Sequence, residues 1–540
     1  MRKVLPLQNW PVWAGPIVTL ACSPGLTFQP LATIKLVALG VFAAFGATEI
    51  LSMLKNWRAK SEPILISSLV IFLCTLSVPL LFSGAPLSQQ IYGASGRSIG
   101  FLHYFFLACI VVGTILNVTE KRISKILFSL IVTGFIQCLY ASLQFFKLDP
   151  ISWSNPNNWL FGTFGNPNFL SSLLGMAGFA NVFQYIYGKK SKFAFLYLLN
   201  SIFCIGIIVL SKSVQGLILF GFGMTVIVLM YTYTKSKAVF RLSSIAALLS
   251  FLVAGLGLFK IGPLAKFMYQ DSTSFRGDYW RAGLSMFKNS PFYGVGLDSY
   301  GDNYRQYRDS LAAERRGLDM FSNSAHNLFI DLGATGGILL LGFYLILNIA
   351  VFSLVIRRIK SLQPASIAFL TLWLCFNIQS VISINVSSIA IWGALFLGVL
   401  IKSERLSRPQ GSNQSGKSSK SSESGYGLYS LIACMSFVLF ALAPFLVRDI
   451  QLSSALESND LSKVKSVVVA WPRSCELMTK AQNASTALKD FQGALDVARI
   501  SVNDNPKCYE SWLILSTSPQ SSFEEKRIAE ARLKILEPNS

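Results

Sequence analysis

Long apolar stretches follow one another along most of the chain, and a polar segment separates each from the next. A helix needs about 20 apolar residues to cross the ~30 Å of hydrocarbon in a bilayer. Thirteen stretches have roughly that length, at about residues 11–29, 31–53, 63–82, 99–117, 126–146, 167–187, 193–210, 213–233, 242–260, 332–356, 364–382, 384–401 and 428–447. The pattern therefore predicts an all-α fold, a polytopic membrane bundle of about thirteen helices.

The composition agrees with this pattern, because 52% of the residues are hydrophobic and only 14% are charged. That balance excludes an ordinary soluble domain. The nine cysteines and two histidines show no metal-ligand spacing, and most of the cysteines lie in the apolar stretches. We therefore expect no metal site and no cofactor.

The charged residues indicate the orientation of the bundle. If the N-terminus is cytoplasmic and the segments alternate, the cytoplasmic segments carry 22 basic and four acidic residues. The loop at 261–325 carries eight and seven, and the tail from residue 448 carries 12 of each. This asymmetry is the positive-inside signal of a multi-pass protein of the cytoplasmic (inner) membrane. Topology thus accounts for the net charge of +21, and no nucleic-acid partner is expected.

The same orientation divides the chain into four parts. Residues 1–402 form the transmembrane domain, whose long loop at 261–325 is extracytoplasmic. Residues 403–427 are rich in Ser, Gly and Lys and are expected to be a disordered cytoplasmic linker. Residues 428–447 form one more transmembrane helix, which places residues 448–540 outside.

The tail at 448–540 shows a weak repeat. Pro472, Pro506 and Pro538 each close a helix-like run, at spacings of 34 and 32 residues. Pairs of helices with such a period are typical of tetratricopeptide repeats. The tail is therefore either a surface for a protein partner or a plain helical cap on the membrane domain. Cys475 and Cys508 lie in it, and spacing alone does not decide whether they pair.

One histidine stands at the junction of the long loop and an apolar stretch. His326 lies in Ser324-Ala325-His326-Asn327, where water meets membrane. An imidazole titrates near neutrality and can take a proton from an incoming hydroxyl. The alternative is a histidine that only caps a helix.

Two further polar segments are candidates for ligand binding. Asn166 in Gly165-Asn166-Pro167 suits a helix N-cap, and a helix start can also hold an anion. In the long loop, Arg276 and Trp280 share one face of a possible helix, with Arg281 beside them. Arg276 could clamp a diphosphate with two hydrogen bonds. An aromatic face of this kind can equally lie on the bilayer or pack in a core.

Together these segments resemble the O-antigen ligase and polymerase-like family. The resemblance covers about residues 10–402 and rests on GTFGNPN, on R-x-x-x-W before N-S-P-F-Y-G-V-G, and on A-H-N before a glycine-rich helix. Members of this family resemble GT-C-like transferases, need no metal, and move a glycan from undecaprenyl diphosphate to an acceptor hydroxyl on the outer face. The added span and tail also resemble a subset of the family.

The resemblance implies roles for particular residues. His326 would be the base, Arg276 would stabilise the diphosphate, and Asn327 would orient the histidine or the sugar. Arg97 resembles another basic position of the family. Lys212 stands where the family often has arginine, which puts a second diphosphate contact in doubt because lysine is a point charge.

Three functions remain open at this stage. A ligase would pass the glycan to a lipid, a protein or a cell-wall glycan, whereas a polymerase would pass it to another repeat unit. The tail mildly favours a ligase, because growing a glycan chain does not obviously need one. A transporter or flippase for a lipid-linked sugar belongs to another class, and its expected internal repeat of spans is not visible in the sequence.

Overall fold

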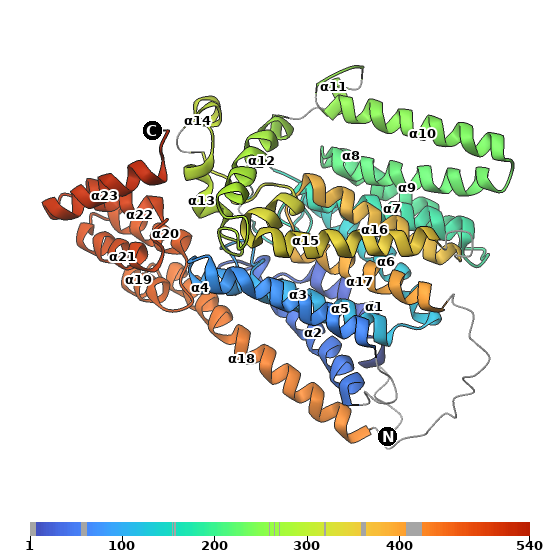
Figure 1. The fold of residues 1–540 in the computed structure, drawn as a ribbon, viewed down its shortest axis with the longest axis horizontal. Helices are drawn as coiled ribbons and strands as arrows, with labels where there is room; N and C mark the ends of the chain where they lie inside the picture. The colour runs from blue at the N-terminus through green and yellow to red at the C-terminus, as the bar shows by residue number, and fades with distance from the viewer. Residues whose placement is uncertain are drawn as a thin grey trace.

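The computed structural model describes residues 7–55, 62–153, 155, 158–258, 260–263, 265–268, 271–317, 320–357, 363–406 and 424–539. Within these residues every regular element is a helix, as the apolar pattern predicts (Figure 1). The linker predicted at 403–427 lies outside the described residues from 407 to 423.

The helices fall into a membrane body, a loop group and a tail. The first part of the body contains η1 Leu7–Asn9, α1 Trp10–Leu20, α2 Ala32–Lys55, α3 Pro63–Phe82, α4 Leu87–Tyr92, α5 Phe101–Asn117, α6 Glu120–Phe145, α7 Pro167–Tyr187, α8 Phe195–Leu210, α9 Val214–Tyr233 and α10 Lys237–Leu258. The loop group contains α11 Ala265–Met268, α12 Asp271–Asn289, α13 Tyr300–Tyr307 and α14 Ser310–Arg316. The body resumes with α15 Leu328–Arg357, α16 Pro364–Ile382, α17 Ser387–Leu406 and α18 Ser424–Glu457. The tail contains α19 Leu461–Val469, α20 Cys475–Ala487, α21 Phe491–Asp504, α22 Tyr509–Thr517 and α23 Phe523–Leu536.

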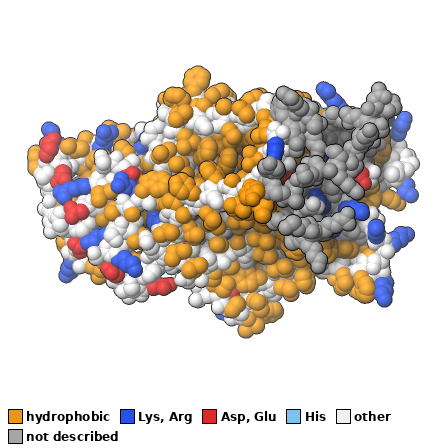
Figure 2. All heavy atoms as spheres, turned by 90° about the horizontal axis from the view of Figure 1, so that it is seen from below, with side chains coloured by type: hydrophobic (Ala, Val, Ile, Leu, Met, Phe, Trp, Pro, Cys, Tyr) orange, Lys and Arg blue, Asp and Glu red, His pale blue; other side chains and the backbone are white. Residues whose placement is uncertain are grey.

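Each of the thirteen predicted stretches overlaps one of these helices. Among the described residues, nine helices are long and apolar enough to cross a membrane. Three more, α5, α8 and α17, are shorter apolar helices. The chain is therefore a multi-pass membrane protein. On the face drawn in Figure 2, hydrophobic side chains cover the middle of the molecule, and charged side chains gather toward its two ends.

The first helix is shorter than predicted. α1 ends at Leu20 rather than near residue 29, which leaves 11 residues and about 16 Å of helix. A turn through Ser23 and Gly25, whose φ is 73°, carries the chain away. The buried Lys35 ammonium donates to the carbonyls of Thr19 and Ala21 at 2.7 and 2.8 Å, and so satisfies carbonyls at the end of the helix.

Small residues allow the closest helix contacts in the body. A Cβ on Gly113 of α5 would lie 2.4 Å from the Cα of Gly46 of α2. A Cβ on Gly175 of α7 would lie 2.4 Å from the carbonyl oxygen of Gly216 of α9. Because larger side chains would not fit there, these glycines let the helix backbones touch.

The fifteenth helix is broken inside the body. Gly337 has φ 72° and ψ −173°, so α15 consists of two helical pieces. The Ser290-Pro291-Phe292-Tyr293-Gly294-Val295-Gly296 segment fills the break. The amides of Val295 and Gly296 donate to the carbonyls of Ala334 and Thr335 at 2.8 and 3.1 Å. These hydrogen bonds give partners to carbonyls that would otherwise accept no helical hydrogen bond at the break.

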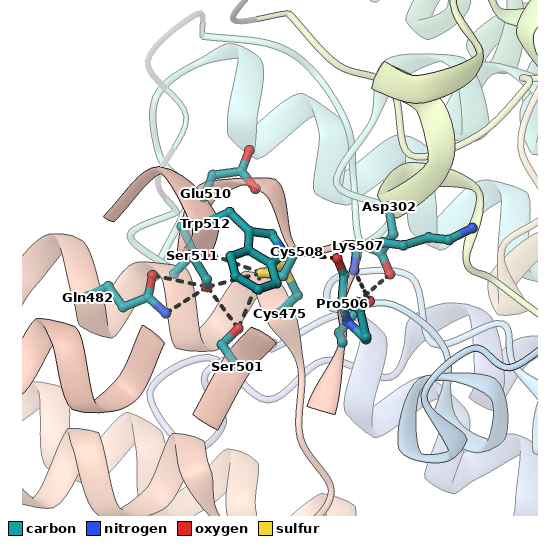
Figure 3. Close-up of a disulfide and its surroundings, with 12 residues drawn as sticks. Asp302, Cys475, Gln482, Ser501, Pro506, Lys507, Cys508, Glu510, Ser511 and Trp512 are labelled. Carbon is teal, nitrogen blue, oxygen red and sulfur yellow. Dashed lines mark hydrogen bonds between the residues drawn. A yellow bond between two sulfur atoms is a disulfide. The ribbon is translucent and has the colours of Figure 1, made fainter. Parts of the chain in front are cut away.

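The tail docks on the loop group. α18 leads into α19–α23, and Cys475 forms a disulfide with Cys508 (Figures 1 and 3). The disulfide lies beside the segment that contacts α13, where the Asn505 amide donates to Asp302 at 2.8 Å. The buried guanidinium of Arg308, just after α13, pairs with Glu537 of the tail. The tail therefore contacts the loop group directly and helps to fix its position.

Candidate active site

His326 lies in a left-handed backbone conformation directly before α15. Its φ is 54°, and its amide donates to the Ser324 hydroxyl at 2.9 Å. The ring Nδ1 lies 3.3 Å from the Ser324 carbonyl oxygen. A carbonyl can only accept, so this contact requires a proton on Nδ1 and leaves the lone pair on Nε2. In that tautomer Nε2 is the ring nitrogen that can accept a proton.

Asn327 caps the helix that follows. Its side-chain oxygen accepts from the amides of Phe329 and Ile330 at 3.0 and 3.2 Å. The geometry is that of an N-cap. The structure thus places Asn327 at the start of α15, beside His326 in the chain, with its side chain engaged in capping.

The loop helix α12 brings an aromatic ring onto His326. The Tyr279 ring stacks on the imidazole with a centroid distance of 5.2 Å and an interplanar angle of 28°. Gly283 makes this approach possible, because a Cβ there would lie 2.6 Å from Ile330 of α15. The Tyr300 hydroxyl holds α12 in place by donating to the Tyr279 carbonyl at 2.6 Å.

Arg276 and Trp280 lie on the same helix as Tyr279. Arg276 precedes Tyr279 by three residues and is 8% exposed. Burial lowers the pKa of its guanidinium, and proximity to Tyr279 opposes that shift; an arginine remains charged all the same. Within the described residues, Arg276 Nε and Trp280 Nε1 are buried and have no hydrogen-bond partner. Two unsatisfied donors one helical turn apart are unusual in a folded protein and indicate a place for an acceptor.

Arg97 ties the α4–α5 segment to the loop that leads to His326. Its guanidinium lies 3.0 Å from the Asp298 carboxylate and also donates to the Asn323 carbonyl. Burial raises the pKa of Asp298, while Arg97 and the amides of Ala94 and Ile99 favour its ionised form. Arg97 Nε has no partner among the described residues.

The Asp331 carboxylate holds the residues directly before His326 in place. Asp331 accepts from the Ser324 hydroxyl and from the Ala325 amide, both at 2.8 Å. It is 6% exposed and lies one turn into α15. The sequence pattern did not single out Asp331, although an acidic residue in an apolar helix is a known signal of function. It also missed Asp298 and Tyr279, for which the sequence offers no comparable signal.

Arg281 points into an acidic group of the loop. Its guanidinium lies 2.5 Å from Asp278 and 2.5 Å from Asp309, and the hydrogen bond with Asp309 raises its pKa. Arg315 contacts the same Asp278 oxygen at 2.7 Å. These ion pairs connect α12 with α14.

Asn166 and Lys212 belong to a second cluster at the starts of α7 and α9. Asn166 caps α7 by accepting from the Asn168 amide at 2.8 Å, as predicted. The Asn168 side chain accepts from Ser213 at 2.7 Å. Lys212 precedes Ser213, has φ 57° and is exposed. The GTFGNPN segment and the Lys212 segment therefore meet.

A belt of buried polar residues connects the two clusters beneath the surface. Thr163 donates to the Thr19 carbonyl at 2.8 Å, and Thr19 donates to the Ser388 carbonyl at 3.1 Å. The neighbouring Ser387 contacts Nδ1 of His103 at 3.1 Å, and His103 stands one turn into α5, the helix that follows Arg97. We call this end of the bundle the site end. The opposite end, which carries the Lys- and Arg-rich turns, is the basic end.

The family model described as O-antigen ligase matches residues 199–345. The match spans Lys212, Arg276, Trp280, Arg281, His326 and Asn327, whereas Arg97 and Asn166 lie outside it. No curated protein matches the chain. The chain is thus a multi-pass membrane protein that is similar to the O-antigen ligase family over residues 199–345.

Proposed function

We propose that this protein moves a glycan from undecaprenyl diphosphate to an acceptor hydroxyl on the outer face of the cytoplasmic membrane. The similarity of residues 199–345 to the O-antigen ligase family supports a glycan transferase of the ligase or polymerase type. The donor, the acceptor and the residues that act on them belong to the proposal.

The observation that carries the proposal is that α12, which holds two unsatisfied buried donors, also contacts His326. Tyr279 contacts His326 with its ring and lies three residues from Arg276. Arg276 Nε and Trp280 Nε1 lack partners among the described residues. A diphosphate has many acceptor oxygens and would satisfy both donors, and guanidinium groups suit it best.

In the proposed reaction, Nε2 of His326 takes the proton of the acceptor hydroxyl. The acceptor oxygen forms a bond to the anomeric carbon while the bond from that carbon to the diphosphate breaks. The electron pair leaves with the diphosphate, and Arg276 stabilises the charge that develops there. The donor already carries a good leaving group, so the proposed reaction uses no metal.

An apolar cavity near the site supports a lipid-linked donor. It has a volume of about 470 Å³ and lies between α3, α5, α15 and α17. Leu328 and Tyr104 line it at the site end, and Ile401 and Leu354 line it toward the basic end. A polyprenyl chain is long and apolar, and a cavity that begins two residues after His326 could receive it while the diphosphate stays at the surface.

The tail supports the proposed sidedness. Disulfides persist in oxidising compartments outside the cytoplasm, and Cys475 pairs with Cys508. The tail and the loop group contact each other, so both lie on one side of the membrane.

A transporter or flippase is the alternative from another class. The break in α15 at Gly337 is a feature that transporters also have. The proposed base and diphosphate contacts, however, lie at one end of the bundle rather than at its middle. Transport also leaves the base and the buried donors without a role.

The proposal is tested with purified protein in detergent, supplied with a glycan on undecaprenyl diphosphate and with candidate acceptors. Release of undecaprenyl diphosphate is the readout. We expect His326→Ala to lower release by roughly 10²–10⁴-fold, as for loss of a general base, with donor binding largely retained. Arg276→Ala should weaken both, and Arg527→Ala, whose side chain is 69% exposed in the tail, serves as the control.

Wild-type release by His326→Ala would contradict the base assignment. The acceptor that supports release distinguishes a ligase from a polymerase. Movement of the lipid-linked glycan across vesicles, with no release for any acceptor, would favour the transporter.

A further inference from the structure

A second cavity lies on another side of the body, at the basic end. Its volume is about 940 Å³, and its walls come from α6, α7, α8 and α16. It shares no lining residue with the cavity near His326. Most of its lining is apolar, with many aromatic side chains, including Phe128, Phe135, Phe183, Phe193 and Phe203.

We call this cavity the wedge; its lining runs along α6 and α8 from their basic ends to the point where the rings of Phe135 and Phe203 meet. At the closed end the rings of Phe135 and Phe203 lie 6.3 Å apart. One turn further on, the sulfurs of Cys138 and Cys204 are 3.8 Å apart. Toward the basic end, α7 forms the floor and Pro364 of α16 contributes to the lining.

The depth of the wedge matches one leaflet of a bilayer. The α6 lining runs from Ile123 to Phe135, which is about 18 Å of helix. Half of a bilayer's hydrocarbon is about 15 Å. Phe128 and Leu199 on the rims are both 54% exposed, as expected where helices face lipid. The wedge is therefore open to acyl chains of the leaflet at the basic end.

The rim of the wedge is positively charged on two sides. Lys189, Lys190 and Lys192 are exposed in the turn between α7 and α8, and Lys189 lines the cavity itself. Lys121 and Lys125 are exposed on the first turns of α6, next to the lining residue Ser124. Basic pockets between helices on this side of a membrane are suited to anionic lipid headgroups.

The wall also carries a polar spot. Asn200 donates to the fully buried Asn181 at 3.1 Å, and both line the cavity. Asn200 Oδ1 is buried and has no hydrogen-bond partner among the described residues. It lies five residues into α8, about 8 Å from the start of that helix. Pure hydrocarbon would leave this oxygen unsatisfied, whereas a hydrated headgroup brings donors with it.

We propose that this cavity is a binding site for an anionic phospholipid of the surrounding leaflet. The acyl chains lie in the wedge against the aromatic side chains, and the phosphate lies against Lys189, Lys190 and Lys192. The site is independent of the proposed transfer reaction. A polyprenyl diphosphate is the other membrane lipid that carries a phosphate, but the wedge is closed after the depth of one leaflet.

The test is native mass spectrometry of the full chain in detergent, with added phosphatidylglycerol or phosphatidylcholine of identical acyl chains. We expect one tightly retained phosphatidylglycerol and a preference over phosphatidylcholine of at least tenfold. The triple variant Lys189→Gln, Lys190→Gln, Lys192→Gln should lose that preference, since each lysine near an anionic lipid contributes about fivefold.

A matched control removes the same charge elsewhere on the same side. Lys235 lies between α9 and α10, Lys237 and Arg241 lie at the start of α10, and all three line neither of the two cavities. Their triple replacement by Gln should keep the preference. Equal losses in the two triple variants would overturn the proposal, because they would reflect positive charge in general.

A second pair of variants tests the wedge itself. Ala194 lines the cavity, whereas Ala246 is exposed on α10. Ala194→Trp should displace the retained lipid with an unchanged elution volume, and Ala246→Trp should not. Retention by Ala194→Trp would overturn the proposal, as would copurification of a polyprenyl diphosphate in place of the phospholipid.

Discussion

At the scale of single residues, His326 depends on neighbours that come from three parts of the chain. Tyr279 stacks on its ring, the Ser324 hydroxyl accepts from its amide, and Asp331 holds Ser324. The sequence pattern identifies His326 and Arg276 as candidates because of their residue types and positions. It does not identify Tyr279 or Asp298, because an ordinary loop tyrosine or aspartate looks the same in sequence. The proposed roles of His326, Arg276 and Lys212 remain predictions.

Arg276→Lys tests whether the guanidinium shape matters as well as its charge. Lysine keeps the charge and lacks the Nε donor that has no partner among the described residues. A lost hydrogen bond to a charged group is worth about 1.5–3 kcal/mol, so kcat/KM for the donor should fall by roughly 10–150-fold.

The control is Arg527→Lys, because Arg527 and its partner Glu524 are both exposed in the tail. Its kcat/KM for the donor should stay within about twofold of the wild-type value, because exposed ion pairs contribute little. A wild-type rate for Arg276→Lys would mean that a point charge suffices.

At the scale of elements, the apolar pattern predicts the helices well and their interruptions poorly. The bounds of α3, α7 and α16 agree with the predicted stretches. The pattern does not reveal the break in α15, because Gly337 lies in an unbroken apolar stretch. The break depends on amides from residues 290–296, which are distant in sequence. The length of an apolar helix can thus be predicted from its own residues. Whether the helix is interrupted depends on contacts with distant segments.

Gly337→Ala tests the break in α15. A Cβ there would lie 2.3 Å from the Phe292 carbonyl oxygen, and the backbone is left-handed with φ 72°. Strain of this kind costs of order 1–3 kcal/mol. We expect a clearly lower melting temperature in detergent and reduced transfer activity.

Gly342→Ala is the control within the same helix, because a Cβ there meets nothing within 4 Å. It should leave stability unchanged or slightly raised, as alanine favours helix. Equal destabilisation by both variants would show that the break has no special role.

The contact between α13 and the tail leads to a further prediction. Arg308 donates to the Met320 carbonyl at 2.7 Å and pairs with Glu537, and the side chains of both residues of this pair are 1% exposed. Glu537→Gln leaves a buried charge without its partner, which costs about 3–5 kcal/mol. Hydrogen exchange at residues 320–326 should therefore increase markedly.

Glu524→Gln, which breaks an exposed pair with Arg527 on the same helix, should leave exchange in this segment unchanged. If Glu537→Gln leaves the exchange at 320–326 as in wild type, the tail does not stabilise the segment that leads to His326.

At the scale of the whole molecule, the charge pattern predicts which side each polar segment occupies. The structure groups the loop helices with the tail, and Figure 1 shows the turn between α9 and α10 at the opposite end of the bundle. The tail consists of the helices α19–α23, in agreement with the helices predicted for it. The tetratricopeptide assignment remains a prediction.

Ser310→Cys and Ser236→Cys test the orientation as a pair. Ser310 is exposed in the loop group, and Ser236 is exposed between α9 and α10. In intact cells, a membrane-impermeant maleimide should label Ser310→Cys and not Ser236→Cys, and lysis should make both reactive. Protection of position 310 before lysis would reverse the proposed topology.

The sequence by itself determined the helical class, the approximate position of each apolar helix, the long loop and the family resemblance. These properties depend on the order of apolar and polar residues along a short stretch, which a bilayer sorts directly. Only the tertiary structure decided that Arg97 pairs with Asp298, that Tyr279 stacks on His326 and that Glu537 reaches Arg308. Each of these contacts joins segments that are dozens to hundreds of residues apart, and it forms because the packing of other helices brings the segments together.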